Sequence, residues 1–211
     1  MKDYLTKRLK VVDALAEMDG LDAFPDMMVI LMTILSACAA HRWPGDRIDR
    51  KRFIELLVRH SHSEARTDSV CVPALINLGL VTEADTLYGS SGLNTRIFRD
   101  EEIDLSLEAA QRAFSAVDRK LLKSNCYASL IYEWLRCGYA HEYSPHQFIT
   151  TCQPSCKQAR VSYISRRLKG QNSLKMVGFH YDYLRNLVEH HISALPELKS
   201  KRPSRWWVDE A

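Results

Sequence analysis

Helical hydrophobic periodicity is the feature that most constrains how this chain can fold. Apolar residues at steps of three and four predict an amphipathic helix over 3–18. The next segment, from about Pro25 to His41, is apolar nearly all round, so we expect a helix in the middle of the fold. Its apolar run is shorter than the roughly 18–20 residues that span a bilayer, and we therefore expect no membrane span.

Further helical patterns continue along most of the chain, and one stretch departs from them. Helices are expected over 49–60 (with Asp49 as its N-terminal cap), 73–80, 101–122, 124–136 and 180–194, with a turn at 43–46 and a Gly/Ser/Asn loop at 88–95. After Pro145 the apolar period changes to two, which predicts a β-hairpin at about 160–178. The fold class is therefore mainly α, a helical bundle with a small β-hairpin before the last helix. We expect one domain over 1–198 and a basic C-terminal tail over 199–211, frayed at 199–203.

Composition indicates the class of protein and its expected location, and it says little about the chemistry of the protein. Hydrophobic residues make up 46% of the 211 residues and charged residues 26%, which is typical of a globular domain. The net charge of +3 permits a nucleic-acid partner without requiring one. The first residues are charged and amphipathic, unlike a secretory signal, so we expect a cytoplasmic protein with six reduced cysteines.

The segment from Arg136 to His141 holds the residues best suited to chemistry. An arginine guanidinium matches two phosphate oxygens at once, and a histidine can take and return a proton near neutral pH. Cleavage of RNA by its own 2′-hydroxyl needs such a base and such a charge, and needs no metal. On an ideal helix the two side chains stand about 140° apart. They converge only if the helix ends or bends between them, for which Gly138 is suited, or if a second copy completes the site. Alternatively, both residues simply complement the dipole of a helix C-terminus.

A family resemblance supports the chemical interpretation. Leu135 to Tyr143, LRCGYAHEY, resembles the Arg-x4–6-His signature of the HEPN superfamily (higher eukaryotes and prokaryotes nucleotide-binding), and 101–194 is similar to a bacterial and plasmid-borne HEPN family of unknown role. The resemblance implies a HEPN-like bundle, a homodimer, and metal-independent endoribonuclease activity on RNA without a cofactor, in a toxin–antitoxin or phage-defence setting. Arg136 would bind the scissile phosphate and His141 would act as general base or acid. The family often has Asn or Asp after the arginine, where this chain has Cys137.

The resemblance also singles out Tyr143. The spacing Arg-x4-His-x-Tyr is similar to HEPN toxins that a nucleotidyltransferase antitoxin silences by adenylylating the tyrosine. Tyr143 would then be the modification site, and such an enzyme would be a partner. The alternative is an interfacial aromatic residue.

Two other classes of function stay open. The same fold could be a catalytically inactive module that binds a nucleotide, RNA or a protein, which Cys137 favours. It could also be a structural component of a larger complex.

Several other residues are weaker candidates for a functional site. Cys152 and Cys156 lack the matched second pair of a zinc site, and the histidines at 60, 62, 190 and 191 lack metal-ligand spacing, so we expect no metal. The basic residues Arg160, Arg166, Arg167 and Lys169 are either phosphate contacts or a solvated face. Trp206 and Trp207 are expected to dock the tail, on this chain or on a partner, and the alternative is that they stack a base. No phosphate-binding loop, dinucleotide motif or nucleophile elbow occurs.

Overall fold

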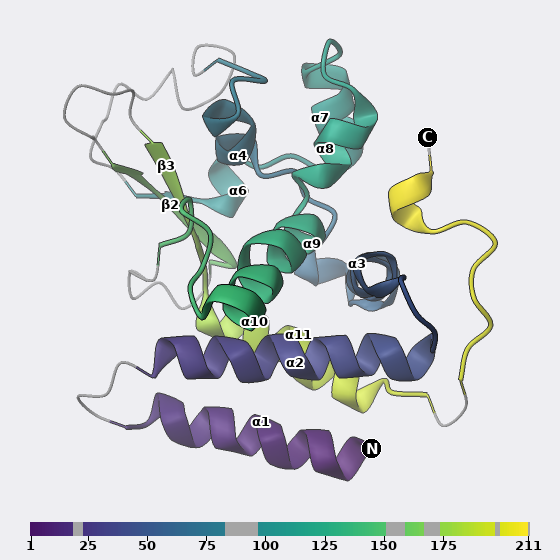
Figure 1. The fold of residues 1–211 in the computed structure, drawn as a ribbon. Coiled ribbons are helices and arrows are strands. Elements are labelled where there is room, and N and C mark those ends of the chain that lie inside the picture. The colour runs from purple at the N-terminus through teal and green to yellow at the C-terminus, as the bar shows by residue number, and fades with distance from the viewer. Residues whose placement is uncertain (19–22, 83–96, 151–158, 167–173, 197–198, 211) are drawn as a thin grey trace.

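The chain folds into a mainly helical structure with a small three-stranded antiparallel sheet, as Figure 1 shows for the computed structural model. The structure describes residues 1–18, 23–82, 97–150, 159–166, 174–196 and 199–210. The expected class, mainly α with a β-hairpin before the last helix, is confirmed at this level. The expected loop at 88–95 lies outside the described residues.

Three long helices form the base of the fold. α1 (Lys2–Ala16) lies antiparallel to α2 (Phe24–Arg42), and α11 (Tyr181–Ser193) packs behind both (Figure 1). α2 buries one side along its whole length: Met27, Met28, Leu31, Met32, Ile34, Leu35, Cys38 and Ala39. Among the helices of the described residues, it is the one whose length and composition alone would allow a membrane crossing, although much of it is buried inside the fold.

α3 and α4 follow as the sequence predicted, with small differences. α3 (Asp49–His60) has the expected bounds, but Ile48 occupies the cap position and no side chain caps the helix. Asp49 instead forms an ion pair with Arg52 on the next turn. α4 (Val72–Asn77) is shorter than the predicted 73–80, and Gly79 continues the chain in a left-handed turn at φ +67°.

The stretch predicted as one helix over 101–122 is divided in three. α6 (Asp100–Ile103), α7 (Leu107–Ala113) and α8 (Arg119–Ser124) are separate because two polar residues start new helices. Ser106 Oγ accepts the Ala109 N–H at 3.2 Å, and Asp118 Oδ1 accepts the Lys120 N–H at 2.6 Å. Such caps satisfy donors that a helix start leaves unpaired.

The predicted hairpin is present and has one additional strand. β2 (Val161–Arg166) pairs with β3 (Leu174–Phe179), with Val161 opposite Phe179. β1 (Phe98–Arg99) adds to the other edge of β2, with Phe98 opposite Tyr163. A strand of two residues has no detectable alternation, so sequence periodicity could not predict it.

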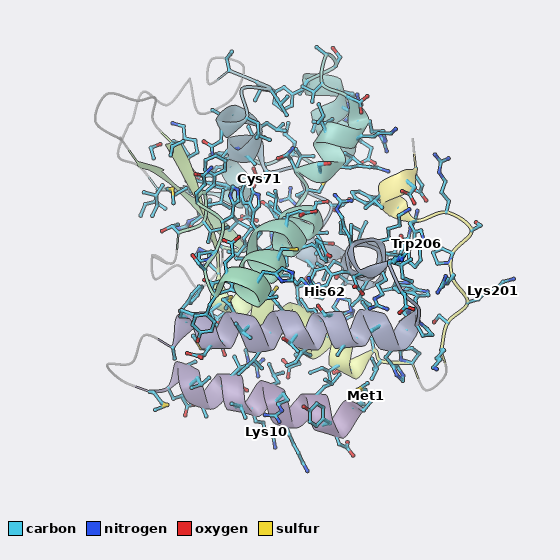
Figure 2. All side chains as sticks on the ribbon, in the orientation of Figure 1. Met1, Lys10, His62, Cys71, Lys201 and Trp206 are labelled. Atoms are coloured by element: carbon cyan, nitrogen blue, oxygen red, sulfur yellow. The ribbon has the colours of Figure 1, made fainter. Side chains whose placement is uncertain are left out.

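The C-terminal tail is docked, as expected for Trp206 and Trp207, and the expected fraying of 199–203 is wrong because the Ser200 N–H donates to Arg42 O at 2.9 Å. Trp206 and Trp207 are both buried, and Trp206 meets the edge of Trp43 at 5.6 Å between ring centroids. A short turn, η4 (Trp207–Asp209), packs against α3 and α8. The tail reaches this place along the outside of the fold, with Lys201 on its outer side and Trp206 directed inward (Figure 2).

Candidate functional site

One helix carries all the residues of the Arg–His motif, and its winding changes along its length. It begins as α9 (Tyr127–Leu130), continues as the π-helical segment η3 (Ile131–Cys137) and ends as α10 (Gly138–Glu142). The helix therefore runs through Gly138 instead of ending there. Wider π-helical turns are uncommon and often occur at functional sites.

Gly138 has a packing role that the sequence did not indicate. A Cβ atom at this position would lie 2.5 Å from the backbone oxygen of Ser144 and 3.3 Å from Pro145 Cα. The chain leaves the helix at Tyr143, which adopts left-handed φ +51°, and folds back over η3. The His146 N–H then donates to Trp134 O at 3.1 Å, and the two rings stack at 5.0 Å with an angle of 7°. Only a glycine allows this close return of the chain.

Arg136 lines a cavity between its own helix and α2. The cavity has a volume of about 160 Å³, and its walls are Val29, Met32, Thr33, Ser36, Arg136 and Ala140. The guanidinium lies 5.3 Å from the centroid of the Tyr132 ring and 4.0 Å from Cys137 Sγ. Within the described parts of the chain, no carboxylate forms an ion pair with it. A half-buried arginine in this condition retains donors for an anion.

His141 lies on the same helix but on a different face. Arg136 and Ala140, four residues apart, both face the cavity, as residues at that spacing do. His141 is one position further, about 100° round the helix, and is exposed on the last turn. No hydrogen bond joins the two side chains among the described residues. One chain therefore places Arg136 and His141 in neighbouring but separate surroundings, and the bend expected at Gly138 does not bring them together.

Tyr143 follows directly after the helix and is 56% exposed. Its hydroxyl donates to Asp26 Oδ1 at 2.5 Å, which connects the end of α10 to the first turn of α2. This hydrogen bond to a carboxylate raises the pKa of the Tyr143 phenol. The ring is therefore accessible at the same end of the helix as His141.

The structure also tests two of the features set aside. Cys152 and Cys156 lie outside the described residues, and no group of three His, Cys, Asp or Glu side chains within the described ranges is placed to hold a metal ion. Arg160 forms ion pairs with Asp100 at 2.7 Å and Glu101 at 3.1 Å, so its charge is already balanced within the fold. Arg160 is therefore a structural residue in this chain.

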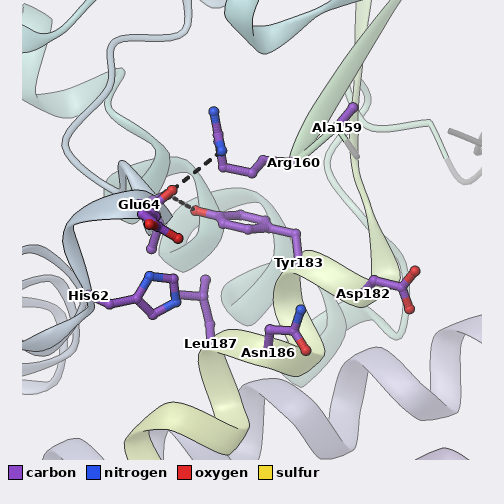
Figure 3. A pocket seen from close by; sticks show the side chains of 9 residues that line it. His62, Glu64, Ala159, Arg160, Asp182, Tyr183, Asn186 and Leu187 are labelled. Atoms are coloured by element: carbon purple, nitrogen blue, oxygen red, sulfur yellow. Dashed lines mark hydrogen bonds between the residues drawn. The ribbon is translucent and has the colours of Figure 1, made fainter. Parts of the chain in front are cut away.

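Figure 3 shows the pocket beside Arg160, with a volume of about 200 Å³ between the start of α11 and the segment after α3. Tyr183 donates to Ala65 O at 3.1 Å, and Arg160 Nη1 donates to Glu64 O at 3.3 Å. His62 and Asn186 complete its polar wall. Both positively and negatively charged side chains line this pocket, so its lining does not indicate one class of ligand.

Four histidines that the sequence presented as two separate pairs meet at the ends of α3 and α11. The rings of His62 and His190 are 5.3 Å apart, and those of His190 and His191 are 5.1 Å apart. His190 Nε2 donates to His60 O at 2.8 Å. Burial, followed by the neighbouring His190, lowers the pKa of His191 to about 3. No local spacing could reveal this cluster, because its two pairs are about 130 positions apart in the chain.

The comparisons with known proteins add no identification. No family model matches the chain, and neither the curated proteins nor the solved structures contain a match.

Proposed function

We propose that this chain is a metal-independent endoribonuclease of the HEPN type, with a HEPN-like bundle, acting in the cytoplasm as a homodimer. The observation that carries the proposal is Arg136. Its guanidinium is half-buried on a cavity wall without a carboxylate partner in the described structure, and the exposed His141 lies on another face of the same helix. An arginine retained in that state is suited to an anionic ligand.

The proposed chemistry gives the two residues different roles. The His141 imidazole takes the proton of an RNA 2′-hydroxyl, and that oxygen attacks the adjacent phosphorus. Arg136 balances the negative charge that grows on the phosphate oxygens. The bond to the 5′-oxygen breaks, and this leaving oxygen takes a proton from an imidazolium. The products are a 2′,3′-cyclic phosphate and a 5′-hydroxyl, so atoms and protons balance without a metal ion.

A second copy supplies what one chain lacks, because Arg136 and His141 of one chain face different ways. The surface between the cavity and α1 supports such pairing. Val29 and Ile30 are half-buried there, Thr33 is exposed, and Tyr4 of α1 is 57% exposed. A partly apolar surface of this kind suits an interface between subunits. In the proposed dimer, His141 of one copy approaches Arg136 of the other.

The test is cleavage of single-stranded RNA in EDTA. We expect wild-type protein to cleave and His141→Ala to lose at least a hundred-fold in rate, the usual contribution of a general base. Arg136→Lys keeps the charge but loses the fork of donors, and we expect an intermediate loss. Glu142→Ala changes the exposed neighbour and serves as the matched control. Equal rates for wild type and His141→Ala, with equal folding by circular dichroism, would refute the nuclease proposal.

The alternative is an inactive binding module with the same fold. Two observations favour it: Cys137 follows the arginine instead of an acidic or amide residue, and the two motif side chains diverge within one chain. In this case Arg136→Ala weakens RNA or nucleotide binding, and neither wild type nor His141→Ala cleaves.

Regulation through Tyr143 and a nucleotidyltransferase partner, in a toxin–antitoxin or phage-defence setting, is the second part of the proposal. The exposed phenol supports it, because the ring is accessible to a modifying enzyme and follows His141 by two residues at the end of the same helix. Co-expression with a nucleotidyltransferase encoded beside the gene should add one nucleotide to the wild type. Tyr143→Phe should stay unmodified, and an unmodified wild type would count against the idea.

A further inference from the structure

The C-terminal arm, which we define as residues 199–205, carries a dense positive charge. Its sequence, KSKRPSR, has four cations and no acidic residue. The arm lies along the body of the protein instead of extending into solvent. The Ser200 N–H donates to Arg42 O at 2.9 Å, and Trp206 then anchors the arm against Trp43. A charge run held in one conformation loses less entropy on binding a partner than a free tail does.

Acidic side chains near the arm are already paired with cations of α3. Asp209 binds Lys51 at 2.7 Å, and Glu210 binds Arg59. The arm's own arginines bind backbone carbonyls: Arg202 donates to Pro44 O at 2.9 Å, and Arg205 donates to Asp209 O at 2.8 Å. Lys199 and Lys201 are exposed and form no ion pair within the described chain. The arm surface therefore keeps a positive excess.

The arm is continuous with the site of Arg136 through one turn of the chain. Arg52 and Arg136 line the same small cavity. Arg52 also donates to Trp43 O at 3.3 Å and to Gly45 O at 3.1 Å. On the other side of this turn, the guanidinium of Arg202 lies where a Cβ at Gly45 would stand. The turn at 43–45 is thus contacted by two guanidinium groups. Arg52 contacts it from the side of the candidate site, and Arg202 contacts it from the arm.

The distance along this path suits a nucleic-acid strand. Along α2 the path runs from Ser36, beside Arg136, to Arg42, beside the arm, which is about 9 Å of helix rise. One strand of a duplex carries one phosphate for about every 3.4 Å of helix axis, and an extended single strand advances further per nucleotide, so three nucleotides or fewer cover that length.

We propose that the C-terminal arm binds the phosphate backbone of a single-stranded RNA whose scissile phosphate lies at Arg136. This inference rests on the proposed function for the identity of the substrate. The arm supplies affinity and direction, because phosphate contacts position a strand without reading its sequence. Cleavage itself belongs to Arg136 and His141.

The test is equilibrium binding of a fluorescein-labelled, 2′-O-methyl oligouridine, which has no free 2′-hydroxyl and stays intact. The test variant is Lys199→Gln with Lys201→Gln. The matched control is Lys7→Gln with Lys10→Gln, which removes the same charge from the exposed side of α1. We expect the arm variant to bind about ten-fold more weakly at 0.1 M salt and the control to change less than two-fold. The slope of log affinity against log salt should fall by about 1.4 for the arm variant, about 0.7 for each lost phosphate contact.

Each outcome supports or overturns the arm proposal separately from the nuclease proposal. Arm-dependent binding without cleavage by the wild type would support the arm and refute the nuclease. Cleavage with equal binding by the arm and control variants would support the nuclease and overturn the arm. Binding of anionic phospholipid vesicles in place of the oligonucleotide, or no binding by the wild type, would also overturn the arm proposal.

Discussion

Replacing Gly138 by alanine tests the packing of the candidate site. Two physical effects of this substitution predict opposite changes in the free energy of unfolding. Alanine is favoured over glycine in a helix by about 1 kcal/mol, so propensity alone predicts a more stable protein. Packing predicts the reverse, since the new Cβ would stand 2.5 Å from the backbone oxygen of Ser144. Backbone atoms cannot move aside as a flexible side chain can. Overpacking of this kind costs about 1–3 kcal/mol.

A further loss decides the balance. Moving Ser144 and Pro145 outward pulls the His146 N–H away from Trp134 O, now at 3.1 Å, and a lost backbone hydrogen bond costs about 1 kcal/mol. Set against the gain in propensity, the expected result is a net destabilisation of about 1–3 kcal/mol.

The measurement is urea unfolding followed by circular dichroism. Ala140→Gly, two positions along the same helix, is the matched control and should lose about 1 kcal/mol by propensity alone. Gly138→Ala should also shift the fluorescence of Trp134, whose ring stacks on His146. A Gly138→Ala protein more stable than the wild type would refute the argument that the returning chain requires glycine.

Three further predictions concern buried groups elsewhere in the fold. Because the pKa of His191 is lowered to about 3, its contribution to stability is present above pH 6.5 and is lost as the pH falls toward 3. When the pH falls from 7.5 to 5.5, the free energy of unfolding of the wild type should decrease by about 1.4 kcal/mol more than that of His191→Gln. Equal decreases in urea titrations would contradict this. Burial raises the pKa of Asp104 to about 7, so stability falls as the pH rises from 3.8 through 7. When the pH falls from 7.5 to 5.5, the free energy of unfolding of the wild type should therefore increase by about 2 kcal/mol relative to that of Asp104→Asn. An increase of the same size in both proteins would exclude Asp104 as its source. Trp207→Ala removes a ring 4.6 Å from the buried Lys123 ammonium and should cost about 3–5 kcal/mol, with rapid tryptic cleavage in the released arm. A tail as resistant to trypsin as the wild type would show that the arm stays docked through Trp206 without the Trp207 ring.

Much of the secondary structure could be predicted from the sequence because it depends on local spacing. The periodicity of 3–18, 25–41, 49–60 and 180–194 predicted helices close to those of the structure, and alternation predicted the hairpin of β2 and β3. The spacing at which side chains return to one face depends on the backbone geometry of their own segment, so neighbouring residues are enough to reveal it. The sequence also predicted that Trp206 and Trp207 dock the tail, and the structure buries both in this chain's own core.

Tertiary structure decided the features that depend on distant partners. The sequence identified Arg136 and His141 but not their orientation, which follows from π-helical winding before Cys137 and from the packing of the helix on α2. Residues far apart in the chain also form the histidine cluster and the contact between the arm and the turn at 43–45. Hydrophobic periodicity states which face of an element is buried, and it carries no information about which element covers that face. The chain alone therefore determined the helices and the residues suited to chemistry, and long-range packing decided which of them lie together.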